Sequence, residues 1–294
     1  MVDSAAFTLR HEPNLAAKHA AFDYQQEATE FVRSRDFSAI FHEQGLGKTK
    51  IAIDAILSWL RDGHIDTALV FAKKGLVDNW MREFGQHTFL KPSILSENAA
   101  ENYYVLTSPI RVIVAHYEVA KKEERRLTAW LKTRRVATVL DEAVKIKNPD
   151  AELTRAFLRL SPLFAKRVVM TGTPAANRPY DVWALAHFLD HGAALGNDFA
   201  SFKADLDIPR GEVVTNRVLD AYRQRLAAVQ ERLATISIRE TKGGGRVVLP
   251  DKEYVRVECD WEPAQFELYR RVQEDLRATL VRDGELVEDD MRRC

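Results

Sequence analysis

The chain has 294 residues, of which 46% are hydrophobic and 29% are charged, an ordinary globular composition with room for one large α/β domain or two smaller ones. Lys plus Arg and Asp plus Glu each number 43, which excludes a nucleic-acid binder that relies on overall positive charge and leaves only a local basic patch for such a contact. With Cys259 and Cys294 as the only cysteines, a disulfide framework and a multi-cysteine zinc site are excluded.

Five short apolar runs, rich in β-branched residues, are predicted to be strands. They are nearly continuous rather than alternating, which is typical of strands buried on both faces of a parallel sheet. Amphipathic helical stretches lie between them, so strand and helix alternate as in a doubly wound α/β sheet, where ligands bind at the carboxyl ends of the strands. The predicted strands are Ser38–His42, Thr67–Ala72, Arg111–His116, Ala137–Asp141 and Arg167–Thr171, with helices such as Lys50–Arg61 and Leu76–Phe84.

After about Pro179 the pattern changes to mainly helical segments. Helices are predicted over Arg178–Asp190, Asn216–Leu233 and Pro263–Arg282, and the alternation of Tyr254–Glu258 predicts a strand. Three consecutive glycines, residues 243–245, indicate a turn. The last third is therefore expected to be a mostly helical extension of the sheet domain.

A glycine-containing loop between the first predicted strand and helix predicts a phosphate site. In SAIFHEQGLGKT, Gly45 and Gly47 let the backbone curl with its N–H groups directed at phosphate oxygens. The helix dipole points at the same anion, Lys48 supplies a charge for the β- and γ-phosphates, and the Thr49 hydroxyl is placed to bind magnesium. His42 stands where the general pattern has a further glycine. The alternative is a plain glycine-rich turn with a solvated lysine.

Two acidic residues, Asp141 and Glu142, end the fourth predicted strand. A carboxylate there can hold the magnesium shell, and its neighbour can polarise the attacking water as a general base. The alternative is a turn at Asp141 with Glu142 capping the next helix. Their place on the third strand after the loop's own strand favours the functional interpretation.

Thr171, Gly172 and Thr173 follow the fifth predicted strand and are expected at the same edge of the sheet. Short hydroxyls there can relay contact between the acidic pair and a neighbouring lobe. The alternative is a hydroxyl-stabilised turn before a proline.

Together these elements resemble the N-terminal RecA-like lobe of superfamily-two helicases, specifically the Swi/Snf-type DNA translocases, from about Phe22 to Cys294. HEQGLGKT is similar to the family's DEMGLGKT, LDEAVKIKN to its DEAH box with a trailing K-N segment, and MTGTPAANRP to its TGTP-x-x-N motif. The late segments RETK, LPDK and QFELY resemble a series that separates Swi/Snf-type proteins from other members. The resemblance implies an α/β RecA-like P-loop NTPase lobe, with a doubly wound, mainly parallel sheet and a helical C-terminal extension.

The resemblance also implies ATP and Mg²⁺ as cofactors and gives the site residues their roles. Lys48, Asp141 and Glu142 are implied to be catalytic, with Thr49 and Asp141 holding Mg²⁺. The segment Thr171–Thr173 is implied to couple the nucleotide to the rest of the motor. Nucleotide contacts are implied for Gln25, as the adenine-reading glutamine, and for Gly45, Leu46, Gly47, Lys48, Thr49 and Lys50.

Nucleic acid, expected as double-stranded DNA, is the implied partner. Phosphate contacts from the motifs after the second and third strands would be independent of sequence, as a translocase requires. For Lys73 and Lys74 an ordinary solvated helix start remains the alternative. The implied contact residues are Lys73, Lys74, His116, Tyr117 and Lys147.

The sequence departs from the family pattern at two places. Val144 replaces the histidine of the DEAH box, which often links nucleotide state to nucleic acid, and Ala72–Lys73 stand where the second motif usually has a proline. The family completes its site with a second RecA-like lobe that supplies an arginine finger. The ending DDMRRC resembles the helix ahead of that lobe. We therefore expect a second lobe in the same or another chain, and weak ATP hydrolysis by this chain alone.

The predicted organisation is an N-terminal arm over residues 1–20, an ATP-binding lobe over 21–190 and an extension over 191–294. The leading hypothesis is a DNA-translocating ATP hydrolase. The alternative is a non-catalytic nucleotide- or DNA-binding regulatory module derived from such a motor, which Val144 favours. An unrelated P-loop NTPase would lack the PDKEY and QFELY segments. No long apolar run or basic leader is present, so we expect a cytoplasmic protein, at the nucleoid or in the host cytoplasm if viral, with no membrane partner and no secretion.

Overall fold

The computed structural model describes residues 13–175, 178–207, 216–244, 246, 253–267, 269–270 and 273. The chain divides into two compact units, Met1–Val248 and Leu249–Cys294. The first unit holds the sheet and the candidate site. Within the described ranges, no helix is both long enough and apolar enough to cross a bilayer.

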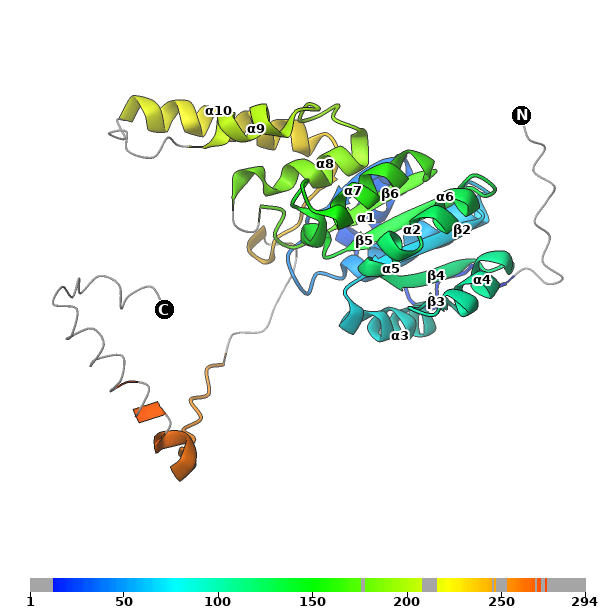
Figure 1. The fold of residues 1–294 in the computed structure, drawn as a ribbon, viewed down its shortest axis with the longest axis horizontal. Coiled ribbons are helices and arrows are strands. Elements are labelled where there is room, and N and C mark those ends of the chain that lie inside the picture. Colours follow the sequence, from blue (N-terminus) through cyan, green and yellow to red (C-terminus); the bar gives the residue numbers. More distant parts are fainter. Residues whose placement is uncertain are drawn as a thin grey trace. The chain divides into compact units, whose positions relative to one another are not determined.

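A parallel sheet forms the centre of the first unit (Figure 1). In the described part of the chain its seven strands follow the order β3-β4-β2-β5-β6-β1-β7, and neighbouring strands are parallel. Parallel neighbours need long crossover connections, which the helices supply. The predicted doubly wound parallel sheet is thus confirmed. The strands are β1 (Phe37–Ile40), β2 (Thr67–Ala72), β3 (Ser93–Leu95), β4 (Val112–His116), β5 (Val136–Asp141), β6 (Lys166–Met170) and β7 (Ser237–Ile238).

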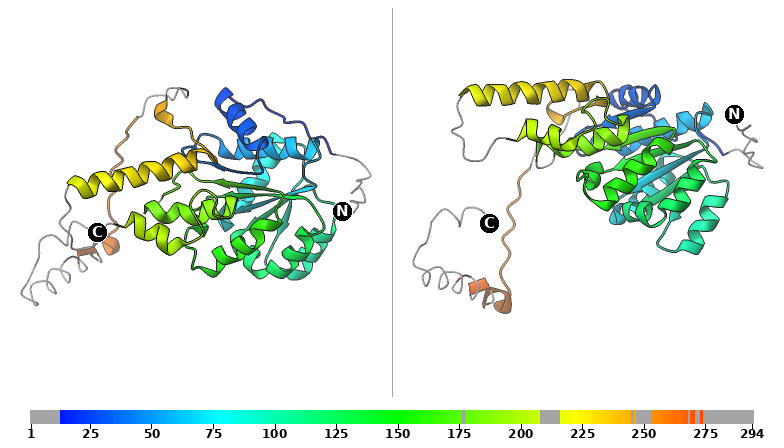
Figure 2. Two further views of the ribbon diagram at one scale, coloured as in Figure 1. Left: turned by 90° about the horizontal axis from the view of Figure 1, so that it is seen from above. Right: turned by 45° about the horizontal axis from the view of Figure 1, so that its top comes forward.

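Helices cover both faces of this sheet (Figure 2). One core packs α1 (Asp23–Arg33), α2 (Lys48–Arg61) and α3 (Val77–His87) against the strands. The other core involves α4 (Ala99–Thr107), α5 (Tyr117–Lys122), α6 (Glu124–Leu131), α7 (Glu152–Leu160), α8 (Trp183–Asp190) and α9 (Phe199–Leu206), with α10 (Asn216–Ala234) packed against it. Short 3₁₀ helices are η1 (Lys74–Leu76), η2 (Ala143–Ile146), η3 (Ser161–Leu163), η4 (Pro179–Val182) and η5 (Lys242–Gly244).

The central strand β2 explains why the apolar runs are continuous. Ala68, Val70 and Ala72 belong to one core, whereas Leu69 and Phe71 belong to the other. Successive side chains of a strand point to opposite faces, so a strand covered on both faces needs an apolar residue at every position. Because every position of β2 is buried and apolar or small, its ends are clear in the sequence, and its predicted bounds agree with the structure.

Some predicted elements differ from the observed ones. The helix after the phosphate loop begins two residues earlier than predicted, at Lys48. The predicted helix Arg178–Asp190 divides into η4 and α8. The short strands β3 and β7 were not predicted, because runs of three and two residues carry too little pattern.

In the second unit, the prediction of a strand over Tyr254–Glu258 is wrong. Residues 253–262 form neither strand nor helix, and Tyr254 and Val257 are 88% and 74% exposed. Alternation alone does not make a strand, because its backbone groups need a neighbour to pair with. Of the predicted helix Pro263–Arg282, residues 263–267, 269–270 and 273 are helical. The rest of that prediction, like residue 245 of the glycine turn, lies outside the described residues.

Candidate functional site

The phosphate loop leaves β1 and enters α2 through a left-handed residue. Gly47 caps α2 with φ 71° and ψ 33°, and Gly45 has φ 84°. A Cβ on Gly47 would lie 2.2 Å from Nε2 of Gln25, so a side chain here meets both backbone strain and a clash. The 14-residue helix α2 directs its free N–H groups toward the loop. The loop therefore curls through two left-handed glycines, as the sequence predicted, and its use for a phosphate stays a prediction.

Lys48 folds back over this loop. Its Nζ donates hydrogen bonds to the carbonyl oxygens of His42, at 3.0 Å, and Glu43, at 3.2 Å. Burial lowers the pKa of Lys48, whereas the nearby carboxylates of Glu142 and Asp141 raise it. The ammonium is thus held at the loop by two neutral acceptors and faces the acidic pair.

The acidic pair lies level with the phosphate loop. Asp141 of β5 and Ile40 of β1 are both in register with Met170 of the strand between them, so the carboxyl ends of these strands meet at one edge. Asp141 accepts a hydrogen bond from Nε1 of Trp80 at 2.9 Å. Burial raises the pKa of Asp141, and the Trp80 hydrogen bond opposes that rise. Glu142 follows with φ 52°, a left-handed conformation that turns the chain sharply out of the strand.

One cavity of about 540 Å³ joins these elements. The loop, the start of α2, the acidic pair and Gln25 of α1 all line it, so residues predicted separately do come together. Its lining includes Gln25, Gln44, Gly45, Gly47, Lys48, Thr49, Lys50, Asn79, Glu83, His87, Asp141 and Glu142.

Three of the predicted nucleotide contacts have partners inside the protein. Leu46 is buried in the core, 1% exposed, which leaves only its backbone for a ligand. The buried ammonium of Lys50 pairs with Asp54 one turn along α2. Gln25 is buried, and its Oε1 accepts from the backbone N–H of Phe22 at 3.1 Å.

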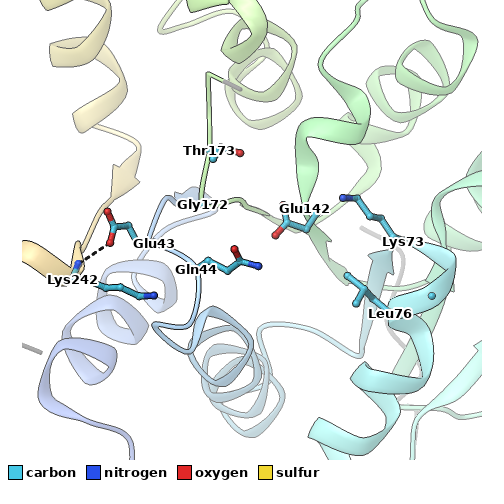
Figure 3. Close-up of a pocket in the computed structure, with 9 residues that line it drawn as sticks. Glu43, Gln44, Lys73, Leu76, Glu142, Gly172, Thr173 and Lys242 are labelled. Atoms are coloured by element: carbon cyan, nitrogen blue, oxygen red, sulfur yellow. Dashed lines mark hydrogen bonds between the residues drawn. The ribbon is translucent and has the colours of Figure 1, made fainter. Parts of the chain in front are cut away.

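A second cavity, of about 870 Å³, adjoins the first at the phosphate loop (Figure 3). Gln44 and Glu142 line both cavities. In Figure 3 Glu43 and Lys242 lie on one side of Gln44, with Glu142 and Lys73 on the other. The full lining is Glu43, Gln44, Lys73, Gly75, Leu76, Glu142, Gly172, Thr173 and Lys242.

The predicted coupling segment Thr171–Thr173 contacts the phosphate loop. The backbone N–H of Thr171 donates to the carbonyl of Ile40 at 3.1 Å, and its buried Oγ1 accepts from the N–H of Thr173 at 3.1 Å. A Cβ on Gly172 would lie 3.4 Å from the backbone nitrogen of Gln44 and 3.7 Å from Nζ of Lys48. The segment therefore lies where the loop, the lysine and the second cavity meet.

The predicted DNA-contact residues do not form a single patch. Lys74 and His116 converge on Glu97, with Nζ at 3.0 Å and Nε2 at 3.7 Å from Oε1. Lys122, which the sequence did not single out, reaches the other oxygen of Glu97 at 3.2 Å. The two lysines lower the pKa of Glu97 to about 2. This cluster of Lys74, His116, Lys122 and Glu97 is called the Glu97 cluster below.

The other predicted contact residues do not pair with Glu97. Lys73 is exposed and lines the second cavity, and Lys147 pairs with Asp181 at 3.0 Å. Tyr117 is 2% exposed, and its hydroxyl donates to the backbone oxygen of Asp141 at 2.7 Å. Its placement therefore favours a structural role beneath the acidic pair over direct contact with DNA.

Sequence reasoning missed three residues of the site. Trp80 is a core residue, 1% exposed, but its hydrogen bond to Asp141 was not foreseen. Lys242 and Glu97 were not singled out, because nothing in their local sequence indicates a contact with a distant strand end. Only the register of the sheet brings them there.

Fold and site define the class of protein, a RecA-like lobe of P-loop type. The family model of the SNF2-related domain matches residues 24–292. The chain therefore belongs to the SNF2-related family.

Relatives of known name agree with this assignment. An uncharacterized ATP-dependent helicase of Mycoplasma pneumoniae is 27% identical over 261 residues, 84% of this chain and 23% of the relative. The lymphoid-specific helicase of Homo sapiens is 25% identical over 252 residues, 80% of this chain and 29% of the relative. The chain thus spans less than a third of the length of either relative.

Solved structures share the fold. The Sulfolobus solfataricus SWI2/SNF2 ATPase core in complex with dsDNA matches with a TM-score of 0.64 and 22% identity, over 96% of this chain and 57% of that chain. The core domain alone from the same organism matches with a TM-score of 0.61 and 23% identity, over 95% and 56% of the two chains.

Proposed function

We propose that the chain is the ATP-binding lobe of a duplex-DNA translocase, which uses Mg-ATP and needs a second RecA-like lobe for full hydrolysis. The observation that carries the proposal is the meeting of the phosphate loop and the acidic pair in one cavity. An isolated glycine-rich turn with a solvated lysine would not place Lys48 opposite two carboxylates on another strand.

The residues of the cavity fit a nucleoside triphosphate. The left-handed glycines carry no side chain that would obstruct phosphate oxygens at the loop backbone, and the α2 dipole favours the same anion. The amide of Gln25 lies against Gly47 of the loop. We propose that this amide recognises the adenine. Lys48 would exchange its two carbonyl acceptors for phosphate oxygens, which carry charge and bind an ammonium more strongly.

The metal ligands proposed are the hydroxyl of Thr49 and the carboxylate of Asp141. Both are hard oxygen donors, which suit Mg²⁺, and both line the same cavity. Among the described residues no group of three His, Cys, Asp or Glu side chains could hold a metal. A site with only Thr49 and Asp141 as protein ligands fits Mg²⁺, because this ion binds in nucleotide sites through one or two protein ligands, phosphate oxygens and water. When bound, the ion would neutralise phosphate charge, while Glu142 would orient and deprotonate the attacking water.

Duplex DNA is proposed as the partner because the Sulfolobus relative was solved with dsDNA. On this chain the basic side chains proposed to contact backbone phosphates are Lys73, Lys74, His116 and Lys147. A DNA partner also places the protein in the cytoplasm or nucleoid rather than outside the cell.

The binding half of the proposal is tested by titrating labelled ATP with Mg²⁺ against wild type and Lys48→Ala. Removing a charge-assisted phosphate contact should weaken binding roughly 10-fold to 100-fold. Lys132→Ala is the matched control, since Lys132 is exposed at the amino edge of β5, away from the cavity. Equal affinities for wild type and Lys48→Ala would contradict the proposal.

A non-catalytic regulatory module is the second candidate, favoured by Val144 in η2, whose side chain cannot hydrogen-bond as the family's histidine does. The two candidates differ when a second RecA-like lobe is supplied. A translocase should then show DNA-stimulated ATP turnover that Glu142→Gln abolishes. A regulatory module should bind ATP without turnover, and robust DNA-stimulated turnover by this chain alone would contradict the need for the second lobe.

A further inference from the structure

The chain after β7 runs along the phosphate loop. The N–H of Phe41 donates to the carbonyl of Ile238 at 2.8 Å, and the N–H of Glu43 donates to the carbonyl of Glu240 at 3.0 Å. The backbone N–H of Lys242 then donates to Oε2 of Glu43 at 2.9 Å. The pairing of β1 with β7 thus continues past both strands and ends at the loop itself.

This segment is anchored at its flanks. Both oxygens of the Glu240 carboxylate are used, one by the N–H of Thr241 at 3.1 Å and the other by Arg246 at 3.3 Å. Arg246 also pairs with Glu27 of α1 at 2.5 Å. The position of Lys242 is therefore set by backbone bonds and by neighbouring side chains, not by its own side chain.

The side chain of Lys242 is available to bind a ligand. Its Nζ lies 3.7 Å from the place where a Cβ on Gly45 would stand, and in Figure 3 the side chain extends toward Gln44. Among the described residues no carboxylate is recorded within ion-pairing distance of this ammonium, although Glu43 binds the Lys242 backbone. An exposed lysine beside a phosphate loop without a counter-charge is placed to accept an anion.

The second cavity shows which part of an anion would reach Lys242. In phosphate loops the lysine of the loop extends to the β- and γ-phosphates. Here Nζ of Lys48 lies 3.7 Å from the Cβ position of Gly172, and Gly172 lines the second cavity together with Lys242. The two lysines are also close enough for the charge of Lys242 to add to the effect of burial in lowering the pKa of Lys48.

We infer that Lys242 is a second phosphate-binding lysine, whose ammonium contacts the terminal phosphate of a bound nucleoside triphosphate from the second cavity. This inference rests on the proposed function. It assigns a triphosphate-sensing role to a residue 194 positions after Lys48 in the sequence. A diphosphate, which lacks the terminal group, would not engage it.

The test compares Lys242→Ala, Lys242→Arg and the Lys132→Ala control. Equilibrium titrations with Mg²⁺ measure the affinity for ADP and for an ATP analogue with a non-hydrolysable β,γ bridge. Lys242→Ala should weaken analogue binding about tenfold and ADP binding less than about twofold. Lys242→Arg should restore most of the loss, because guanidinium also binds phosphate. The unfolding midpoint without nucleotide should stay at the wild-type value, since the flanking anchors remain.

Two results would overturn the inference while leaving the proposed function intact. One is wild-type affinity for the analogue in Lys242→Ala, with Lys48→Ala still impaired. The other is an equal loss of ADP and analogue binding in Lys242→Ala, which would mean that the side chain only supports the loop. If the wild-type chain binds neither nucleotide, or if Lys48→Ala binds as wild type, the proposed function itself fails.

Discussion

The indole of Trp80 holds the carboxylate of Asp141 across 2.9 Å, although the two residues are 61 positions apart in the sequence. Trp80 lies on α3 with only 1% of its surface exposed, so its N–H cannot exchange this acceptor for water. The proposed metal ligand is therefore oriented by the helix that follows β2. Replacement of a core aromatic should for this reason affect the chemistry of the site.

Trp80→Phe is expected to weaken both the fold and Mg-ATP binding. The change removes a hydrogen bond to a partly buried carboxylate, so the free energy of unfolding should fall by about 1–3 kcal/mol, measured by urea denaturation with circular dichroism. The Mg²⁺ concentration needed for half-maximal ATP binding should rise. Trp59→Phe is the control, because the Trp59 indole donates to the backbone oxygen of Arg33 at 3.0 Å. An unchanged Mg²⁺ requirement in Trp80→Phe would contradict the orienting role.

Gly47→Ala should lose nucleotide binding and stability together. Its φ of 71° disfavours a side chain, and the new Cβ would meet Nε2 of Gln25 at 2.2 Å. Left-handed strain alone costs about 1–3 kcal/mol. Gly85→Ala is the control: Gly85 is an exposed residue of α3 where an added Cβ would meet no atom within 4 Å, and alanine should stabilise that helix by about 0.5–1 kcal/mol. Thermal unfolding and ATP titration measure both effects. A Gly47→Ala protein as stable as wild type would refute the reading of the loop.

Glu97→Gln should strengthen DNA binding. Glu97 neutralises Lys74 and Lys122 in the Glu97 cluster, and phosphate oxygens could take its place once the charge is removed. The dependence of log K on log salt should steepen by about 1–2, for one or two additional phosphate contacts. Electrophoretic or fluorescence titration of duplex DNA at several salt concentrations gives this slope.

The control for that change is Glu101→Gln, which alters net charge equally. Glu101 is exposed on α4 and accepts a hydrogen bond from Ser96 at 3.0 Å rather than from a lysine. An equal increase in DNA affinity in both variants would mean that only net charge matters. The Glu97 cluster would then have no specific part in DNA binding.

His42→Leu should make the chain less sensitive to acid. Burial lowers the pKa of His42 from its ordinary value of 6.5, with Glu240, Lys48 and Glu27 as its charged neighbours. The unfolded chain therefore takes up a proton that the folded chain resists, so this residue's contribution to stability falls as the pH drops below about 6.5 and is constant above it.

Urea midpoints between about pH 7 and about pH 5 test this dependence. The wild-type midpoint should fall over this range, and His42→Leu should show a smaller fall. His64→Leu is the control, because His64 is exposed after α2. Identical pH profiles for wild type and His42→Leu would show that His42 contributes nothing to the acid response.

Local pattern and family motifs predicted the parallel sheet, the phosphate loop and the acidic pair. The run TALVFA had to be apolar at every position because β2 is covered on both faces, and that requirement is visible in the sequence. The glycines at 45 and 47 are likewise visible, since few other residues adopt their conformation. These features depend on neighbours in sequence or on strong backbone limits.

Contacts between distant elements could not be predicted. β7 pairs only two residues with β1, too few for a periodic signal, yet it brings Lys242 to the loop. The Trp80 and Glu97 contacts depend on side-chain direction after the helices have packed, which no local pattern specifies. The failed strand at Tyr254–Glu258 shows the reverse case, where a local alternation exists but no strand among the described residues pairs with it.

The position of β7 has a consequence for synthesis. Until Ser237–Lys242 has been made, β1 is paired only with β6, and its outer edge beside the phosphate loop stays open. The interval between residues 43 and 242 takes roughly 10–40 seconds at typical translation rates. A nascent chain therefore gains Lys242, the proposed contact to the terminal phosphate, only after all the strands between β1 and β7 have been made, whereas the residues that line the first cavity all precede β6.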